Sequence, residues 1–583
     1  MGNNEMVGPF GAATVFGVQS PPRGYAQLSL ALQRTRLGQL GRNLAGHFRK
    51  PSAAPSWQGM QMFMENRVPP ESLKRAAVYR NFAGNLNDIV AAGLKSGAQV
   101  LLNTVAVNLR DSPPFASVAN ENLPASDRAR FDRLLNQARQ AEATDAWSEA
   151  VTFLRQAVDL DSTHAAAQYR LAVCLARTGD DASAARHFQL ACDLDALPFR
   201  ADTPINAAIR EAAERPSGGG LQLLESAEAL AKQGGEMPCG NESFYEHVHF
   251  NFDGAYRLGL AWAQAVERQA PPGSFGTPQS EWGSQEECER RLGLTDWNRK
   301  LVLESMIRRL QQPPLSSQPN NAARLRQLRE REQALLAGMN PESAANAKAL
   351  YADVIAAHPE DHFLHEAFGN FLQLVGDVPG AIREWQAVGE LLPHDFLPWF
   401  QIGVMQSRQG HHSEARTNLR RALNIRPGLV EGWLELGRSL GAESKWESAS
   451  QAFQRACELR PQDPVLWASR AKSAGELGRR AEAIAFYQRA VELRPGYWEA
   501  RGALGDLFAQ AGRIAEAAAQ YEAAIKAKPD FAMGHFNLGV MFARQGRLDA
   551  AIGEFQTAVR LEPGNQAAAE YLERVQEQRG RKP

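Results

Sequence analysis

A short segment near the middle of the chain combines one carboxylate with two imidazoles. Between Phe244 and Tyr256 the sequence reads FYEHVHFNFDGAY, so Glu246 stands beside His247 and three residues before His249. Imidazoles are common zinc ligands, but no clear third ligand accompanies these two histidines. The segment also precedes an expected helix, where solvated polar residues are ordinary. A metal site, a proton-transfer site and a plain polar surface therefore remain open from these residues alone.

Two motifs, taken in order, resemble conserved blocks of the SGNH (GDSL-type) hydrolases. Gly2-Asn3-Asn4-Glu5 is similar to the Gly-x-Asn-Asp block of that family, and Glu246-x-x-His249 is similar to its Asp-x-x-His block. The resemblance covers about 1–118 and 220–265. It implies that His249 is a general base, that Glu246 orients its ring, and that Asn4 donates to an oxyanion. Glutamate in place of aspartate lengthens the orienting acid by one methylene.

The serine nucleophile of that family has no counterpart in this sequence. In the family, the nucleophile block precedes the Asn block, and here the sequence opens inside the Asn block. We therefore expect Met1 to be an internal methionine of a longer protein. We also expect no appreciable serine-hydrolase activity from the chain as given, because no acyl-enzyme can form without a nucleophile. Whether the longer protein is an enzyme stays open.

The elements that would position these residues follow a helix–strand pattern. Apolar spacing predicts a helix over 72–92, with Leu73, Phe82 and Ile89 roughly on one face. The apolar run 98–107 then predicts a buried parallel strand, and 221–226 is interpreted as a return to the sheet. The loop 108–114 follows the first strand, at the end where α/β sheets bind ligands. This pattern predicts an incomplete three-layer, flavodoxin-like α/β region.

The C-terminal half is governed by a period of 34 residues. Prolines stand at this spacing, and a small residue in each expected first helix and an alanine in each second helix recur with them: Pro359, Pro393, Pro427, Pro461, Pro495, Pro529 and Pro563; Gly369, Gly403, Gly437, Ala471, Gly505 and Gly539; Ala381, Ala415, Ala449, Ala483, Ala517 and Ala551. A 34-residue helix–turn–helix unit of this pattern resembles the tetratricopeptide repeat. Ser444 replaces the turn glycine of the third unit, which predicts strain there.

The same spacing divides the rest of the chain. Two further units, at about 131–164 and 165–198, look like an insertion into the α/β region. The predicted fold is thus mainly α, an α-solenoid joined to an interrupted α/β region. The predicted segments are 1–124 (first α/β part), 125–198 (inserted repeat pair), 199–266 (second α/β part), 267–321 (connector), 322–361 (degenerate repeat), 362–565 (six repeats) and 566–583 (capping helix and tail).

Polar side chains recur where the repeats should line a concave groove. The predicted groove residues are Asn370, Arg438, Lys472 and Asp506, which share one repeat position, and Asn537. Chaperone-binding repeats clamp a carboxylate with Lys and Asn, but Glu366 and Glu435 place negative charge where such a clamp needs cations. We therefore expect a protein or peptide partner in the groove other than a chaperone tail. Solvated surface is the alternative for these residues, and core packing is the expectation for Trp399, Trp433 and Trp467.

Composition narrows the partners and the compartment. The formal net charge is −1, which gives no general reason to expect nucleic acid as a partner. The five cysteines are scattered, so neither a disulfide framework nor a structural zinc site is expected. We expect no cofactor, no membrane span and a cytoplasmic location for the chain as given, and the oligomeric state is not predicted. Two functions remain: an interaction scaffold and an SGNH-like ester hydrolase that carries repeats.

Overall fold

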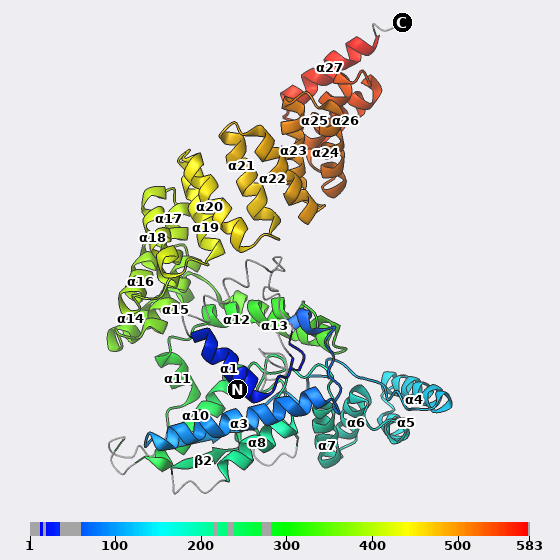
Figure 1. Ribbon diagram of the computed structural model, residues 1–583, viewed down its shortest axis with the longest axis vertical. Coiled ribbons are helices and arrows are strands. Elements are labelled where there is room, and N and C mark those ends of the chain that lie inside the picture. The colour runs from blue at the N-terminus through cyan, green and yellow to red at the C-terminus, as the bar shows by residue number, and fades with distance from the viewer. Residues whose placement is uncertain are drawn as a thin grey trace. The chain divides into compact units, whose positions relative to one another are not determined.

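The computed structural model describes residues 12–14, 19–34, 60–214, 220–230, 237–270, 274 and 282–580. The chain divides into two compact units, Met1–Ser343 and Ala344–Pro583. Figure 1 shows helices throughout both units and a single small sheet in the first. No helix among the described residues is long and apolar enough to cross a membrane. The mainly helical class predicted from the sequence is confirmed.

The first unit contains two short strands among its helices. Its elements are α1 (Arg23–Arg34), η1 (Met60–Phe63), α3 (Leu73–Lys95), β1 (Val100–Asn103), α4 (Ala125–Ala143), α5 (Trp147–Leu160), α6 (Ala165–Arg177), α7 (Asp181–Asp193), α8 (Thr203–Ala213), β2 (Leu221–Leu224), α9 (Ser226–Leu230), α10 (Phe252–Gln269), α11 (Gln285–Arg291), α12 (Asp296–Leu310), η2 (Leu315–Ser317) and α13 (Asn321–Gly338).

The two strands pair in parallel, with Val100 opposite Leu221. Helices cover both faces of the sheet: Leu102 and Leu223 pack toward α3 and α8, whereas Leu224 packs with residues of α9 and α10. The described part of the chain holds this two-stranded sheet and not the larger sheet that a flavodoxin-like domain requires. The first strand is also shorter than predicted. Beyond Thr104, the side-chain amide of Asn206 replaces a strand partner, since it bonds both the N–H and the carbonyl of Val105 at 2.8 and 3.1 Å.

Helix α3 begins where Ser72 accepts a hydrogen bond from the backbone N–H of Lys74. Phe82 is buried, whereas Leu73 and Ile89, which were predicted to share its face, are 86% and 50% exposed. The buried face instead includes Arg75. Its guanidinium donates to Asp202 at 2.7 Å and to two backbone carbonyls, which ties α3 to the start of α8.

The inserted segment forms two antiparallel helix pairs, α4 with α5 and α6 with α7. Its core contains the small and large residues expected of such units, including Ala150, Leu154, Ala184 and Phe188. The predicted insertion therefore consists of helix pairs packed side by side within the first unit (Figure 1).

The second unit is a regular succession of helix pairs. Its helices are α14 (Pro341–Ala357, which begins just before the division), α15 (His362–Leu374), α16 (Val378–Leu391), α17 (Leu397–Arg408), α18 (His412–Ile425), α19 (Val430–Ala442), α20 (Trp446–Leu459), α21 (Pro464–Glu476), α22 (Arg480–Leu493), α23 (Trp498–Gln510), α24 (Ile514–Ala527), α25 (Ala532–Arg544), α26 (Leu548–Leu561) and α27 (Gln566–Gly580). Each predicted repeat holds one pair, and each second helix packs against the next first helix.

Small residues let the paired helices approach closely. A Cβ added at Gly437 would lie 2.4 Å from the ring of Phe453, sixteen residues later, and one at Gly505 would lie 2.7 Å from Tyr521. The turn glycines have positive φ as predicted, and Ser444 adopts φ +58° in the third unit. Because a side chain disfavours that conformation, the predicted strain at this turn is confirmed in its geometry.

One repeat position supplies an N–H group to the preceding proline carbonyl. Trp433 donates to Pro427 at 2.9 Å and Trp467 donates to Pro461 at 2.8 Å. Trp399, at the same position, is buried. These tryptophans therefore serve the packing of their repeats.

The chain changes units inside the predicted degenerate repeat 322–361. Helix α13 packs against α12 and η2 of the first unit. Helix α14 contributes Tyr351 to the second unit, where its ring stacks on Phe368 at 4.9 Å. The frame residues Ala347, Tyr351 and Val354 are all buried.

Candidate functional site

The segment that carries Glu246 folds back on itself ahead of α10. Phe244 and Phe250 form an isolated antiparallel bridge, and the N–H of Tyr245 donates to the carbonyl of His249 at 2.8 Å. Asn251 then caps α10 by accepting from the N–H of Gly254 at 2.9 Å. A Cβ at Gly254 would lie 2.2 Å from the carbonyl oxygen of Ser243, so only glycine fits there. The spacing of acid, histidine and glycine in the sequence is thus a compact turn.

The carboxylate of Glu246 is the centre of this turn. It is fully buried; one oxygen contacts Nδ1 of His249, and the other accepts from the N–H groups of His247 and Val248. Burial disfavours its charge, but the contacts with His247 and His249 and the N–H donors outweigh burial and hold the pKa of Glu246 well below its usual range. Burial lowers the pKa of His247, whose ring lies against the same carboxylate. Glu246 is therefore ionised at neutral pH.

His249 differs from His247 in its access to solvent. Its side chain is 46% exposed, whereas that of His247 is 4% exposed. The carboxylate fixes the ring of His249 through Nδ1. The guanidinium of Arg309, from α12, lies 3.3 Å from Nε2. Within the described part of the chain, no hydroxyl or thiol makes a hydrogen bond to His249. Glu246 and His249 can together hold a proton on an exposed imidazole. However, the guanidinium of Arg309 occupies the place beside Nε2 where a nucleophile would be needed.

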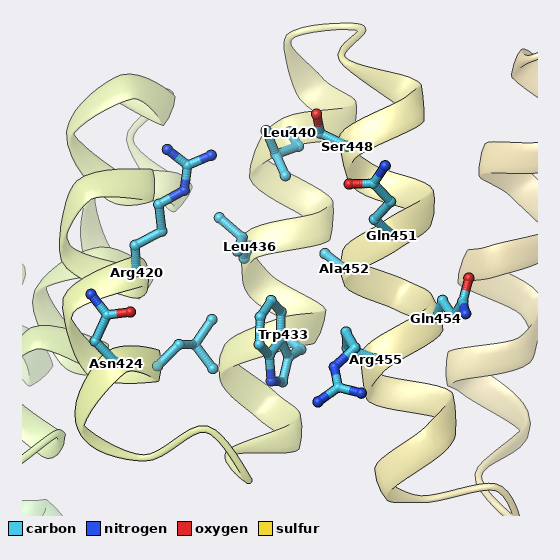
Figure 2. A pocket seen from close by; sticks show the side chains of 11 residues that line it. Arg420, Asn424, Trp433, Leu436, Leu440, Ser448, Gln451, Ala452, Gln454 and Arg455 are labelled. Atoms are coloured by element: carbon cyan, nitrogen blue, oxygen red, sulfur yellow. The ribbon is translucent and has the colours of Figure 1, made fainter.

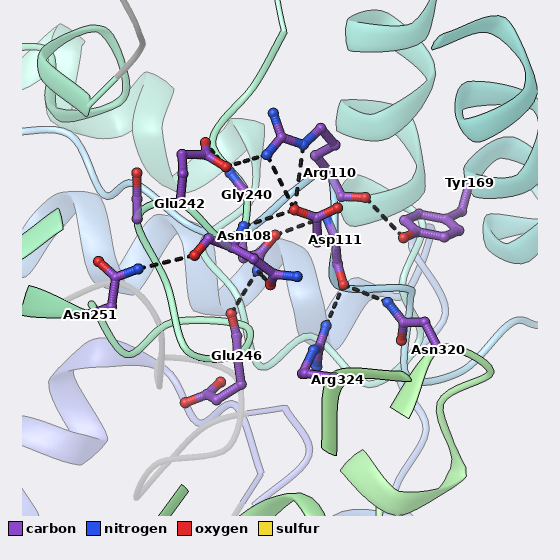
Figure 3. A network of polar contacts seen from close by, with 12 residues as sticks. Asn108, Arg110, Asp111, Tyr169, Gly240, Glu242, Glu246, Asn251, Asn320 and Arg324 are labelled. Carbon is purple, nitrogen blue, oxygen red and sulfur yellow. Dashed lines mark hydrogen bonds and ion pairs between the residues drawn. The ribbon is translucent and has the colours of Figure 1, made fainter. Parts of the chain in front are cut away.

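The loop 108–114, which follows β1, supports the Glu246 turn through hydrogen bonds (Figure 3). The side-chain amide of Asn108 donates to the backbone carbonyl of Glu246 at 2.9 Å. The backbone N–H of Asn108 donates to the carbonyl of His247 at 3.0 Å. Buried Arg200 donates to the carbonyls of Asn108 and Ser112 at 3.0 and 2.7 Å. The loop at the end of the first strand, predicted as a ligand-binding edge, is thus a support for the Glu246 turn.

Side chains far along the chain complete this support. Arg324 of α13 donates to the carbonyl of Asp111, and Asn320 donates to the same carbonyl at 2.7 Å. Burial lowers the pKa of Arg324. Sequence reasoning missed Arg200, Arg309 and Arg324, because a lone arginine has no periodic signal that distinguishes a buried support from a solvated side chain.

A cavity of about 940 Å³ lies beside the same loop, between it and the inserted helix pairs. Aromatic side chains and arginines line much of it: Trp147, Tyr169, Phe188, Arg110, Arg139, Arg170 and Arg177. The hydroxyl of Tyr169 donates to the carbonyl of Arg110 at 2.9 Å, which joins the inserted pair to the loop.

Two further predictions for this region concern Asn4 and a metal site. Asn4 lies outside them, so its predicted oxyanion role has no structural counterpart to examine. No group of three His, Cys, Asp or Glu side chains that could hold a metal is found among the described residues. The contact between Glu246 and His249 is the part of the predicted constellation that the structure brings together.

The predicted groove residues lie on the first helices of the repeats. We call the surface formed by α15, α17, α19, α21, α23 and α25 the first-helix face. Arg438 and Lys472 line a hollow of about 300 Å³ there. Small residues and two aromatic rings line the rest of it: Gly437, Gly441, Ala442, Ser469, Trp446 and Phe453. Arg438 pairs with Glu435 at 2.7 Å. Lys472 is exposed and forms no ion pair within the part of the chain that the structure describes.

A second cluster on this face joins two further predicted residues. Asp506 accepts from Asn537 at 3.1 Å and from the hydroxyl of Tyr521 at 2.6 Å. Burial raises the pKa of Asp506, although the hydrogen bond from Tyr521 opposes that shift. Asn370, on α15, makes no side-chain hydrogen bond within the described residues. The structure thus groups Arg438 with Lys472 and Asp506 with Asn537, and it leaves Asn370 apart.

Comparisons with known proteins identify the repeats. The tetratricopeptide repeat model matches residues 135–200, 404–464, 468–530 and 504–566. Similar solved structures include YrrB, described as a TPR protein with an unusual peptide-binding site (22% identity, 32% of this chain, 96% of that chain, TM-score 0.29). They also include the C-terminal part of a TPR repeat-containing protein from Cytophaga hutchinsonii (13% identity, 39% of this chain, 94% of that chain, TM-score 0.35). A third is MamA from Desulfovibrio magneticus RS-1 (17% identity, 29% of this chain, 96% of that chain, TM-score 0.28). A comparison with curated proteins finds no match.

Proposed function

We propose that this chain, which carries tetratricopeptide repeats in both of its compact units, is a scaffold that binds a segment of a partner protein. The binding surface is the first-helix face of the six-repeat array, which corresponds to the concave groove of such solenoids. Stacked repeats of this kind present an extended surface that single helices cannot. The coarse function, a repeat protein that mediates protein–protein contacts, follows from the repeats themselves.

One observation carries the proposal: the hollow beside Arg438 and Lys472. The rings of Phe453 and Trp446 lie against Gly437 and Gly441 there, so aromatic side chains form part of its wall. Beside it, Lys472 offers an ammonium group that forms no ion pair within the described residues. Further along the face, Asp506 and Asn537 offer acceptor and donor groups. A partner segment would therefore place a carboxylate near α19 and α21 and polar groups near α23 and α25.

Site-directed photo-crosslinking tests this function. A benzophenone amino acid at position 472 should crosslink one partner polypeptide in the cell that makes the protein, and the same group at Glu492, on α22, should not. The purified partner should then bind the chain, and Lys472→Glu with Arg438→Glu should weaken that binding at least tenfold. Binding that is unchanged in this double variant would exclude the first-helix face.

A second candidate function rests on the buried Glu246 and the exposed ring of His249. We propose that the first unit derives from an SGNH-type ester hydrolase, in which this pair would act as general base and orienting acid. In an active enzyme a serine would have to displace Arg309 from Nε2 of His249. The support is the contact between Glu246 and Nδ1 of His249.

An activity-based fluorophosphonate probe separates these alternatives. We expect no labelled serine in the chain as given, because no hydroxyl bonds His249 among the described residues. Stoichiometric labelling that is lost in His249→Ala would instead establish a serine hydrolase.

A further inference from the structure

A groove crosses the opposite side of the repeat array, between α18 and α20 (Figure 2). It has a volume of about 630 Å³ and is floored by Leu423, Trp433, Leu436, Leu440 and Ala452. Trp433, Leu436 and Leu440 follow one another at spacings of three and four, so they share one side of α19. Arg438 lies two residues from Leu436, about 200° around the helix, and therefore faces away from this groove. We call it the second-helix groove.

The rim of the second-helix groove is polar and carries no acid. Its exposed side chains are Arg420, Asn424, Ser448, Gln451, Gln454 and Arg455, and no carboxylate lines it. Arg455 contacts Glu458 at 2.5 Å, outside the lining. Arg420, Asn424, Ser448 and Gln451 make no side-chain hydrogen bond or ion pair within the described part of the chain. The rim thus combines positive charge with free amide and hydroxyl groups above an apolar floor.

Neighbouring repeats close the equivalent groove. In the repeat before, Arg421 covers Trp399, with its guanidinium carbon 3.3 Å from the ring centroid. In the repeat after, Phe486 packs on Trp467 with ring centroids 5.8 Å apart. The residue at the position of Phe486 is here Ala452, so the ring of Trp433 has no such cover. The equivalent of Arg421 is here Arg455, which pairs with Glu458, so the groove is open where Ala452 stands in place of a ring.

The second-helix groove, whose rim comes from two adjacent repeats, also lacks the acids that stand at the equivalent grooves on either side. Where the second-helix groove has Asn424, the flanking repeats have Glu390 and Glu458. Where it has Ser448, they have Glu414 and Glu482. Without these two carboxylates, Arg420 has no ion-pair partner among the described residues, and the groove is complementary to negative charge.

We propose that the second-helix groove is a binding site for an acidic segment of a partner protein. An apolar side chain of that segment packs on Trp433 and Leu436, and a flanking carboxylate pairs with Arg420. Asn424 and Gln451 bond the main chain of the segment, since each amide can both donate and accept. This site is distinct from the first-helix face and does not depend on it.

A random 12-residue peptide library displayed on phage tests the proposal. The full chain is the target, and the variant Asn424→Glu with Ser448→Glu is used for counter-selection. Because both glutamates occur at these positions in the flanking repeats, the variant is expected to fold; circular dichroism checks this. Selected peptides should contain Asp or Glu beside a large apolar residue.

Fluorescence anisotropy of the selected peptides gives the decision. Binding should be at least tenfold weaker in the counter-selection variant and in Arg420→Glu, whose exposed side chain makes that substitution harmless to folding. It should weaken with salt and remain unchanged in the first-helix variant Lys472→Glu. Selection of no peptide, selection of peptides without acids, or binding lost only in Lys472→Glu would each overturn the proposal.

Discussion

Burial of the Glu246 carboxylate would be costly without partners, and the turn around it supplies them. Two backbone N–H groups and the ring of His249 bond the charged form, so the pKa of Glu246 falls despite burial. A group with a depressed folded pKa contributes its stability above the unfolded pKa, about 4.3 for Glu, and loses it as pH falls through the folded value.

The variant Glu246→Gln tests this balance. At pH 7 it should destabilise the first unit by about 1.5–3 kcal/mol, because charge-assisted hydrogen bonds are lost. The difference from the wild type should shrink as pH falls below about 4.3, because the unfolded chain then binds a proton that the folded Glu246 does not. Thermal melts of the full chain from pH 7 to pH 3 measure it, with Glu211→Gln, at an exposed acid of α8, as the control. Parallel stability profiles at all pH values would contradict the assigned ionisation.

At one position of the repeats, the side chain forms a hydrogen bond to the carbonyl of the proline six residues earlier. His535 lies between two acceptors, 2.6 Å from a carboxylate oxygen of Glu554 and 3.0 Å from the carbonyl of Pro529. Trp433 and Trp467 satisfy the same carbonyl position with an indole N–H. His535→Phe should therefore cost about 1 kcal/mol, whereas His535→Trp should cost less. Urea unfolding of a fragment spanning 344–583 compares them; equal losses would show that the N–H group contributes nothing.

At the scale of elements, the turn at Ser444 is an exception among its equivalents. Five equivalent turns have glycine with φ from +73° to +82°, and Ser444 holds +58° with a side chain. Ser444→Gly should relieve about 1 kcal/mol of strain and raise the melting temperature. The reciprocal change Gly410→Ser should lower stability by a similar amount. If Ser444→Gly were neutral or destabilising, the hydroxyl would have a role that the geometry does not reveal.

The regular spacing of the repeats made their helices predictable from the sequence. Polar contacts between residues far apart in the chain were not predictable, because they follow no period. The prolines and turn glycines of the sequence place the helix pairs of 362–565 almost residue by residue. By contrast, the burial of Arg75 depends on Asp202, which lies 127 residues later in the chain. The end of β1 likewise depends on Asn206. In the site, the Glu246–His249 contact could be predicted because it is local, whereas Arg309 and Arg324 arrive from distant helices.

At the scale of the whole molecule, the two compact units should fold separately. A fragment spanning 344–583 should show strong helical circular dichroism and melt cooperatively, because each repeat packs mainly on its neighbours. The shorter fragment 362–578 should be less stable, since it lacks Tyr351 and the rest of α14 that stack on Phe368. A disordered 344–583 fragment would contradict the division at Ser343.

The central claim is that the first-helix face binds a protein segment, and hydroxyl-radical footprinting of the full chain tests it most directly. The partner recovered by crosslinking at position 472 is added, and the oxidation of each side chain is compared with that of the free chain. We predict protection of Lys472, Arg438 and Asn537 on α19, α21 and α25. Protection confined to the second helices of the repeats, or to the first unit, would contradict the claim.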